Sequence, residues 1–248
     1  MTIHLVGGGR DEAWYAELYG PFLAEAGAQP EVACLLLDEG DVPEQFERWS
    51  GALTAAAPCR PRAVPVVPGA AFDPAVLDGA DAVFVGGGLT PEYASALAGP
   101  LGRRLAERPL PYAGFSAGAA IAAGRAVVGG WLSGGVPVCP EETAEDLDEI
   151  EVRDGLGLIA PAVDVHAAQW GTLGRAGRGG RPRRRALRPG DRREHRRDRA
   201  GRGRPGARRG PGAPRPPGRR RGRRRPFLPR GRGAAALTAP LRGGAGHS

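Results

Sequence analysis

Apolar and polar positions form regular blocks along the first two thirds of the chain. Short, nearly continuous apolar runs predict strands at residues 2–6, 31–38, 63–68, 82–88 and 111–115. Amphipathic stretches between them predict helices at 11–27, 43–56, 74–80, 90–108 and from 117 onward. Strands that are apolar on both faces and separated by helices are typical of a parallel sheet covered on both sides. The pattern therefore predicts a doubly wound, mostly parallel α/β fold, with ligand sites at the carboxyl ends of the strands.

The rest of the chain divides into three parts. Residues 130–152 read as an acidic, loop-rich insertion, and residues 155–170 restore an apolar strand that ends near His166. From residue 172 the apolar period stops, and Arg, Gly and Pro dominate. Such a composition buries too little apolar surface to offset the entropy of ordering the chain. We expect an α/β core over residues 1–171 and a disordered basic tail over 172–248.

The charges divide at the same point. Residues 1–171 carry 9 Arg and 24 Asp or Glu, whereas residues 172–248 carry 26 Arg and only 3 acids, and the formal net charge is +8. A tail of this kind can bind nucleic acid by neutralising phosphates. After Trp170 the only aromatic residue is Phe227, which argues against base stacking. Any nucleic-acid binding is therefore expected to be non-specific and confined to the tail.

Several function classes are disfavoured by simple counts. Three cysteines, Cys34, Cys59 and Cys139, lack the CxxC spacing of a zinc site, and an odd, sparse set argues against a disulfide framework. The N-terminus has no signal-peptide pattern, and no apolar run is long enough for a membrane span. Neither glycine-rich turn has the spacing of a dinucleotide or phosphate loop. We expect a cytoplasmic protein with no membrane association, metal or cofactor, and leave its oligomeric state open.

One small-residue cluster predicts a nucleophile. In "PYAGFSAGAAIAAG", residues 111–124, Ser116 lies between Gly114 and Gly118, after a predicted strand and before a predicted helix. The G-x-S-x-G pattern at such a junction is that of a nucleophile elbow, where small neighbours let strand and helix approach closely. The alternative is a tightly packed Gly/Ala turn without chemistry. The backbone N–H of Ala117, at the helix start, is expected to face an oxyanion beside the serine.

A second glycine turn lies at the end of the preceding predicted strand. In "VFVGGGLTPEY" the glycines are expected on the same sheet edge as Ser116, where the amides of Gly87 or Gly88 can supply a second oxyanion donor. The alternative is an ordinary helix-entry turn.

The base is expected to be His166. Of the four histidines, His195 and His247 lie in the tail and His4 lies inside the first predicted strand, whereas His166 closes an apolar run. The carboxylate that orients it stays open among Glu141, Glu142, Glu145, Asp146 and Asp164, and Glu142 is our choice. Asp164 is two residues before the histidine and so on the same face of an extended strand.

The segments "GGGLTPEY", "YAGFSAGAAI" and "VDVHAAQWG" together resemble peptidase family S51, which includes dipeptidase E and cyanophycinase, over roughly residues 1–175. The resemblance implies a class I glutamine-amidotransferase-like fold and a serine hydrolase of small peptides or isopeptides. It further implies Ser116 as nucleophile, His166 as base, and Gly87 or Gly88 with Ala117 at the oxyanion. Serine in place of cysteine at the elbow argues against ammonia transfer from glutamine. A non-catalytic binding protein of this fold is the alternative.

Family members continue past the histidine with further strands and a motif similar to "IDENTA", which the Arg-rich tail lacks. The chain has no lysine, and Arg, Gly, Ala and Pro all have GC-rich codon families. Translation of a GC-rich gene in a shifted frame therefore yields a sequence of this composition. Codons exist for residues 176–181 that read Leu-Val-Ala-Ala-Val one base later. Codons also exist for residues 190–197 that then read Ala-Ile-Asp-Glu-Asn-Thr-Ala. We therefore hypothesise a change of reading frame near residue 175.

Sequencing the gene across codons 170–200 tests this hypothesis. We expect the shifted frame to encode an apolar helix followed by the Ile-Asp-Glu-Asn-Thr-Ala motif. Codons that yield neither segment in the shifted frame would contradict a frame change of any origin. A clean read of the printed tail would contradict a sequencing error as its cause.

Overall fold

The computed structural model describes residues 1–9 and 11–179, all within the first of two compact units, Met1–Ala186. The second unit, Leu187–Ser248, lies outside the described residues, as does the nucleic-acid binding predicted for the tail. In the part of the chain that is described, no helix is both long enough and apolar enough to cross a membrane.

Five parallel strands form the central sheet. Their order across the sheet is β1-β5-β4-β2-β3, and they comprise β1 Ile3–Val6, β2 Glu31–Leu37, β3 Arg60–Val66, β4 Ala82–Val85 and β5 Tyr112–Phe115. Strand β2 shows why the sheet is covered on both sides. Its residues 32–37 are all buried and alternate between two different apolar clusters, because successive side chains of a strand point to opposite faces.

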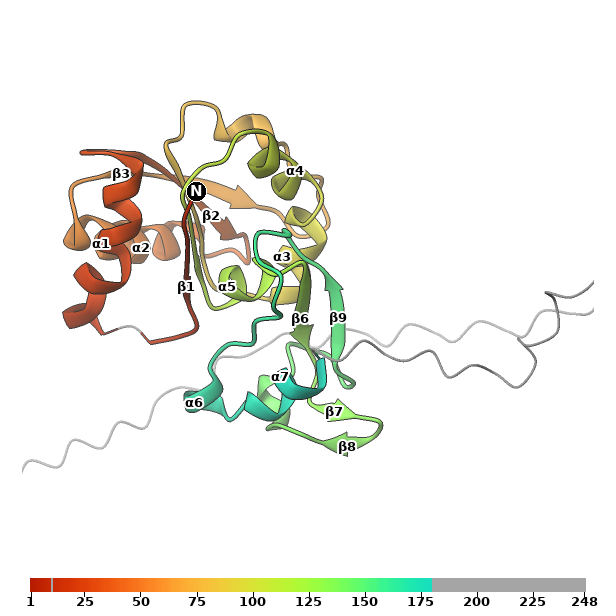
Figure 1. Ribbon diagram of the computed structural model, residues 1–248. Coiled ribbons are helices and arrows are strands. Elements are labelled where there is room, and N and C mark those ends of the chain that lie inside the picture. Colours follow the sequence, from red (N-terminus) through yellow and green to blue (C-terminus); the bar gives the residue numbers. More distant parts are fainter. Residues whose placement is uncertain (10, 180–248) are drawn as a thin grey trace, which may run out of the picture. The chain divides into compact units, whose positions relative to one another are not determined.

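Helices cover both faces of this sheet (Figure 1). One face packs against α1 Tyr15–Ala26 and α2 Val42–Ala56, through a cluster that includes Phe22, Trp49 and Phe84. The other face packs against α3 Thr90–Leu97, α4 Pro100–Glu107 and α5 Ala117–Ile121. Short 3₁₀ turns lie at η1 Glu12–Trp14 and η2 Pro74–Leu77. The predicted doubly wound, mostly parallel α/β fold is confirmed.

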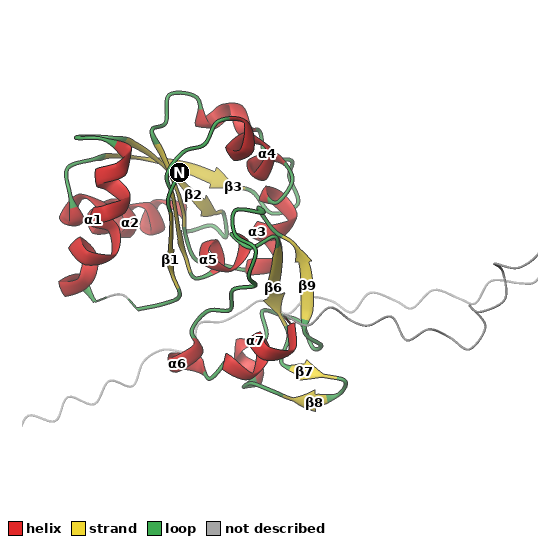
Figure 2. Cartoon of the chain, viewed as in Figure 1, coloured by secondary structure: helices red, strands yellow, loops and turns green. Residues whose placement is uncertain are grey.

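Two predicted elements differ in the structure. The single helix expected at 90–108 is two helices, because Pro100 has no N–H to continue the hydrogen bonds of α3 and begins α4 instead. The strand expected within 155–170, ending near His166, is an extended loop over residues 155–166 (Figure 2). Its Leu156 and Leu158 N–H groups donate to Ile121 and Ala122 at the end of α5, so they are not available for a strand ladder.

Residues 125–154, which include the acidic insertion, contain strand pairings that the sequence pattern did not predict. Strand β6 Arg125–Gly129 pairs antiparallel with β9 Glu151–Asp154. Between them in the sequence lies a hairpin of two strands of two residues each, β7 Leu132–Ser133 and β8 Val136–Pro137. The 3₁₀ turn η3 Glu141–Thr143 follows this hairpin. These strands are two to five residues long, which leaves too few positions for a recognisable alternation.

The packed structure continues past the predicted boundary at residue 171. Helices α6 Ala167–Trp170 and α7 Leu173–Gly179 follow the extended loop, and Thr172 and Arg175 are buried. The buried guanidinium bonds to Asp164 and to the Thr143 carbonyl oxygen. From composition alone, residues 172–179 were assigned to the disordered tail. Composition does not reveal that Arg175 is buried against the carboxylate of Asp164.

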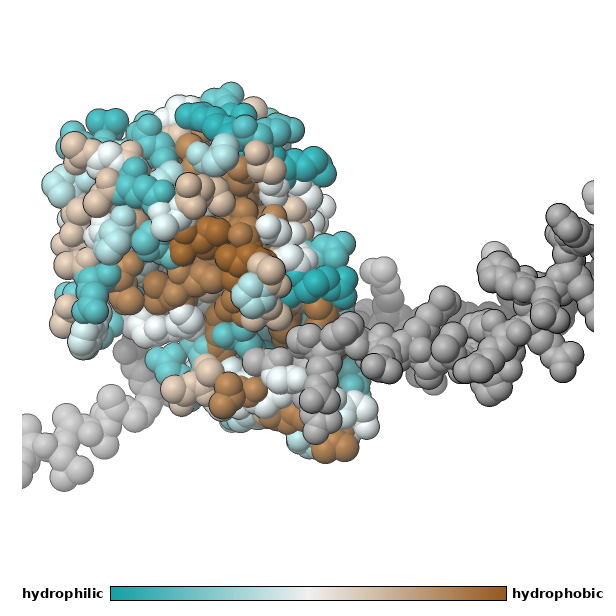
Figure 3. All heavy atoms as spheres, in the orientation of Figure 1, coloured by the Kyte–Doolittle hydropathy of each residue, from teal (hydrophilic) through white to brown (hydrophobic). Residues whose placement is uncertain are grey.

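Strand β1 is an edge of the sheet, paired only with β5 among the described strands. Its Ile3 and Leu5 are only partly buried, and a brown apolar area is visible on this side of the molecule (Figure 3).

Two glycines allow the junction of β5 and α5 to pack against its neighbours. A Cβ at Gly118 would lie 2.3 Å from the Val85 carbonyl oxygen, and one at Gly114 would lie 2.5 Å from the Gly118 carbonyl. Gly118 N–H donates to the Gly86 oxygen at 3.1 Å, and Tyr112 Oη donates to the Gly118 oxygen at 2.7 Å. The approach of backbone to backbone therefore requires glycine at both positions.

Gly118→Ala is expected to lower the free energy of unfolding by about 3 kcal/mol or more, because the added methyl group meets rigid backbone. Urea unfolding followed by circular dichroism measures this. The matched control is Gly51→Ala, in α2, where a Cβ meets nothing within 4 Å and alanine should stabilise the helix by about 0.5–1 kcal/mol. Similar effects of the two substitutions would contradict the close approach.

Candidate active site

Ser116 occupies a strained turn between β5 and α5. Its backbone has φ 52° and ψ −111°, a conformation that non-glycine residues rarely adopt and that costs about 1–3 kcal/mol. The Ser116 N–H donates to the Val6 carbonyl oxygen at 2.9 Å, and its carbonyl oxygen accepts from Ala120 N–H in α5. The turn places the hydroxyl at the carboxyl end of the sheet, and the residue is 8% exposed.

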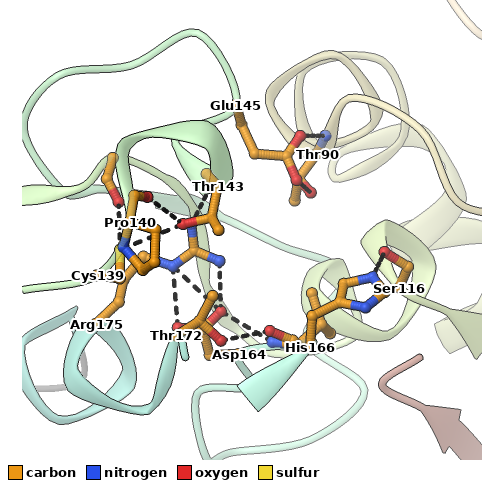
Figure 4. Close-up of polar contacts among 12 residues, drawn as sticks. Thr90, Ser116, Cys139, Pro140, Thr143, Glu145, Asp164, His166, Thr172 and Arg175 are labelled. Atoms are coloured by element: carbon orange, nitrogen blue, oxygen red, sulfur yellow. Dashed lines mark hydrogen bonds and ion pairs between the residues drawn. The ribbon is translucent and has the colours of Figure 1, made fainter. Parts of the chain in front are cut away.

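The imidazole of His166 contacts this hydroxyl. Ser116 Oγ and His166 Nε2 are 2.8 Å apart, although the two residues are 50 positions apart in the chain (Figure 4). His166 precedes α6 in the left-handed conformation, with φ 56°, and its N–H donates to the Gly7 carbonyl oxygen at 2.9 Å. The loop after β1 thus fixes the backbone from which the ring extends.

The other ring nitrogen faces an amide. His166 Nδ1 lies 2.8 Å from Gln169 Oε1, one turn further along the chain. A carboxamide oxygen carries no hydrogen, so this bond requires that Nδ1 donate. In the neutral ring Nε2 is then unprotonated and accepts the hydrogen bond from the Ser116 hydroxyl, which is the tautomer that a general base needs.

Two aromatic rings flank the imidazole. The indole of Trp170 stacks on it, with ring centroids 3.6 Å apart and planes 19° apart, while Phe115 presents its edge at 6.4 Å. Trp170 itself is 46% exposed. Sequence reasoning missed both Gln169 and Trp170, and their only signal was the i+3 and i+4 spacing from the histidine.

The structure does not bring the predicted carboxylates to His166. Among residues 1–9 and 11–179, no carboxylate forms a hydrogen bond or an ion pair with the imidazole. Glu142, our choice, and Glu141 are exposed in η3, and Asp146 is also exposed. Gln169 takes the place that we assigned to Glu142, because the left-handed turn at His166 directs the ring toward its own helix.

The remaining two carboxylates have other partners. Glu145 accepts from the Thr90 N–H and Oγ1 at 3.0 and 3.1 Å, at the start of α3. Burial raises the pKa of the Glu145 carboxyl, against the lowering effect of these two hydrogen bonds. Asp164 turns away from the ring toward Arg175 (Figure 4).

The ion pair of Asp164 and Arg175 anchors the histidine segment. Its shortest N–O distance is 2.7 Å and both side chains are 3% exposed. Arg175 Nη1 also donates to the Thr143 carbonyl oxygen at 2.8 Å, and Thr172 Oγ1 donates to the Val165 oxygen. The residues on both sides of His166 are therefore tied to one another and to the η3 turn.

The predicted oxyanion donors divide between two places. A Cβ at Gly87 would lie 3.4 Å from Ser116 Cβ, so this residue directly adjoins the serine. Ala117 follows Ser116 at the N-terminus of α5. Within the described part of the chain, the N–H groups of Gly87 and Ala117 donate none of the backbone–backbone hydrogen bonds that lie outside helices and strands. Gly88 instead packs toward Leu37 and Tyr93.

Among the described residues, no three or more His, Cys, Asp or Glu side chains form a group that could hold a metal ion. The polar groups at Ser116 are the imidazole and backbone amides, a set suited to acyl transfer.

Comparison with known proteins gives limited similarity. No protein-family model matches the chain, and no curated protein matches it. Among solved structures, the chain is similar to a crystal structure at 1.5 Å of a candidate peptidase E protein from Listeria monocytogenes EGD-e. The two share 19% sequence identity over 63% of this chain and 74% of that one, with a TM-score of 0.40.

Asp164→Asn is expected to lower the free energy of unfolding by about 3–5 kcal/mol, because it leaves the Arg175 guanidinium buried without its counter-charge. Urea unfolding measures this. The same change at Asp154, whose ion pair with Arg125 is 85% and 68% exposed, should cost no more than about 1 kcal/mol. Equal costs would mean that the Asp164 pair is not an anchor.

Proposed function

We propose that the protein is a serine hydrolase that cleaves amide bonds of small peptides through an acyl-enzyme. The observation that carries the proposal is the 2.8 Å contact of Ser116 Oγ with His166 Nε2 at a strained strand-to-helix turn. A hydroxyl alone is a weak nucleophile at neutral pH, and an adjacent base in this tautomer activates it. The motif resemblance to peptidase family S51 suggests the same reaction class.

The first half of the reaction forms the acyl-enzyme. Ser116 Oγ attacks the carbonyl carbon of the substrate while its proton passes to His166 Nε2. The oxyanion that develops is held by the N–H groups of Ala117 and Gly87, of which the first lies at a helix N-terminus. Collapse of the tetrahedral intermediate breaks the carbon–nitrogen bond, and the leaving amine takes the proton from Nε2.

The second half regenerates the enzyme. Water attacks the ester carbonyl and gives a proton to Nε2, and Ser116 Oγ leaves and recovers that proton. All steps use one base and two backbone donors, so the cycle requires no metal or cofactor. A small peptide is the expected partner, and the cytoplasm is the expected location.

A fluorophosphonate probe on the full 248-residue chain tests the nucleophile. We expect one label per chain by intact mass, carried by Ser116 and lost in Ser116→Ala. His166→Ala should slow labelling by about a thousandfold or more, because the serine loses its base. The control Ser50→Ala removes a half-buried helical serine whose hydroxyl donates to the Glu47 carbonyl oxygen, and this variant should label at the wild-type rate.

Two results would overturn the proposal. Labelling that survives Ser116→Ala would place the reactive group elsewhere. A folded chain that is not labelled at all would favour the alternative of a non-catalytic binding protein of this fold, and a panel of dipeptides in a thermal-shift assay would then identify ligands.

A further inference from the structure

The start of α3 lacks a cap from its own sequence. Leu89, at the N-cap position, has no side-chain group that can accept a hydrogen bond. In the first turn Pro91 has no N–H, and the N–H groups of Glu92 and Tyr93 both donate to the carbonyl oxygen of residue 89 at 3.2 Å. The N–H of Thr90 is therefore left to find an acceptor outside the helix, and Thr90 is only 2% exposed.

Glu145 of the acidic insertion supplies this acceptor. Its carboxylate accepts from the Thr90 N–H at 3.0 Å and from the Thr90 hydroxyl at 3.1 Å, across 55 positions of the chain (Figure 4). A negative charge at a helix N-terminus is also favoured by the helix dipole. The carboxylate thus takes the place of the capping side chain that α3 does not have.

The backbone at Glu145 is strained. Glu145 and Asp146 are consecutive left-handed residues, with φ 56° and 61°, a conformation that glutamate rarely adopts. Gly130 N–H, just after β6, donates to the Ala144 carbonyl oxygen at 2.8 Å. A Cβ at Gly129 would lie 2.8 Å from Glu145 Cβ, so the end of β6 packs directly against this turn. Strain of this kind persists where packing fixes it, and it clusters at functional sites.

The glycine turn before α3 is held at its start by the sheet. Gly86 N–H donates to the Leu35 carbonyl oxygen, and the Gly86 carbonyl oxygen accepts from Gly118 N–H, both at 3.1 Å. These bonds fix residue 86 relative to β2 and α5. Glycine has access to many backbone conformations, so the residues between this point and α3 require a second point of attachment to keep one position.

Glu145 provides that second point of attachment through Thr90. Gly87 lies between the two points, and a Cβ there would be 3.4 Å from Ser116 Cβ. An oxyanion donor is effective only within about 2.7–3.1 Å of the developing charge, so a small displacement of the turn removes its effect. The position of the Gly87 N–H therefore depends on a carboxylate of the insertion.

Two charged groups face the Glu145 carboxylate. Burial has the largest influence on its pKa and raises it, whereas the Arg175 guanidinium lowers the pKa and Asp146 raises it. The same guanidinium bonds to Asp164 and to the Thr143 carbonyl oxygen. The insertion therefore interacts both with the glycine turn and with the segment that carries the histidine.

We propose that Glu145 is a positioning residue, which caps α3 and thereby fixes the glycine turn that carries the Gly87 oxyanion donor. The acidic insertion thus holds one side of the site. The inference rests on the proposed function for its catalytic meaning, but the bond to Thr90 and its effect on the turn exist without any reaction.

The bond can be observed without activity. The chain has six threonines, so a ¹⁵N-threonine NMR spectrum of the full chain is sparse, and the Thr90 signal is the one missing in Thr90→Ser. The Thr90 amide shift should move with pH as the Glu145 carboxyl titrates. The midpoint should lie above the usual range of a glutamate, because burial raises this pKa. Glu145→Gln should abolish the movement.

Three variants separate the position of the side chain from its charge, with fluorophosphonate labelling of Ser116 as the readout. Glu145→Gln keeps the length and an acceptor for the Thr90 N–H, and should label within about threefold of the wild-type rate. Glu145→Asp keeps the charge but is one methylene shorter, and should label about 3- to 10-fold more slowly. Glu145→Ala should slow labelling at least about tenfold. The pH of half-maximal labelling should not change, because His166 is untouched.

Circular dichroism and thermal unfolding establish that each variant is folded. Folding is expected, because the Tyr93 hydroxyl bonds α3 to the β2 backbone and aspartate tolerates a left-handed backbone. The matched control is Glu149→Ala. Glu149 belongs to the same insertion and also accepts two hydrogen bonds, from the N–H groups of Gly134 and Gly135, and its loss should leave the labelling rate unchanged.

Three results would overturn the positioning role and leave the hydrolase intact. The first is wild-type labelling in folded Glu145→Ala and Glu145→Asp. The second is slow labelling in Glu145→Gln beside wild-type labelling in Glu145→Asp, which would assign the effect to charge. The third is a shifted pH of half-maximal labelling, which would mean that Glu145 acts through the histidine.

A wild-type chain without label at Ser116 would instead overturn the hydrolase. The Thr90 resonance then decides on the restraint alone. A titration that is lost in Glu145→Gln would support the restraint of the turn, and a Thr90 amide that does not titrate would overturn it.

Discussion

The site depends on one steric constraint, the backbone-to-backbone approach of the turn between β5 and α5 to the end of β4. Without side chains at Gly114 and Gly118, the strand, the turn and the helix come close enough for Gly118 N–H to bond Gly86. That bond places the glycine turn of residues 86–88 beside Ser116. The strained φ of Ser116 persists because the surrounding packing fixes it. The positions of the candidate nucleophile and of the candidate oxyanion donors therefore follow from the same absence of Cβ atoms.

The features predicted from sequence were those that local pattern determines. Apolar runs such as β2, buried on both faces, imply a parallel sheet between helices, and the glycine spacing around Ser116 implies a tight turn at its edge. His166 was found by elimination among four histidines, and the structure brings it to Ser116. The short strands β6 to β9 were missed, because pairing over two to five residues leaves no periodic signal.

The features that could not be predicted depend on where one side chain points. A left-handed backbone at His166 directs its ring to Gln169, whereas an extended strand would have directed it to the side of Asp164. Likewise, nothing in the Arg-rich composition marks Arg175 as different from the arginines after it. Only its 3% exposure and its bonds to Asp164 and Thr143 separate it from the tail.

Arg175 also bears on the reading-frame hypothesis. A guanidinium that is buried without a partner is strongly destabilising. An arginine from an out-of-frame sequence would therefore rarely lie where both a carboxylate and a carbonyl oxygen can accept its hydrogen bonds. Its fit with Asp164 and Thr143 indicates that the chain through Arg175 belongs to the same folded design as the residues before it. For the hypothesised change of frame near residue 175, we therefore expect a position after codon 175. The anchor of His166 precedes that point, so we expect Ser116, His166 and the segment that holds the histidine to come from one continuous reading of the gene.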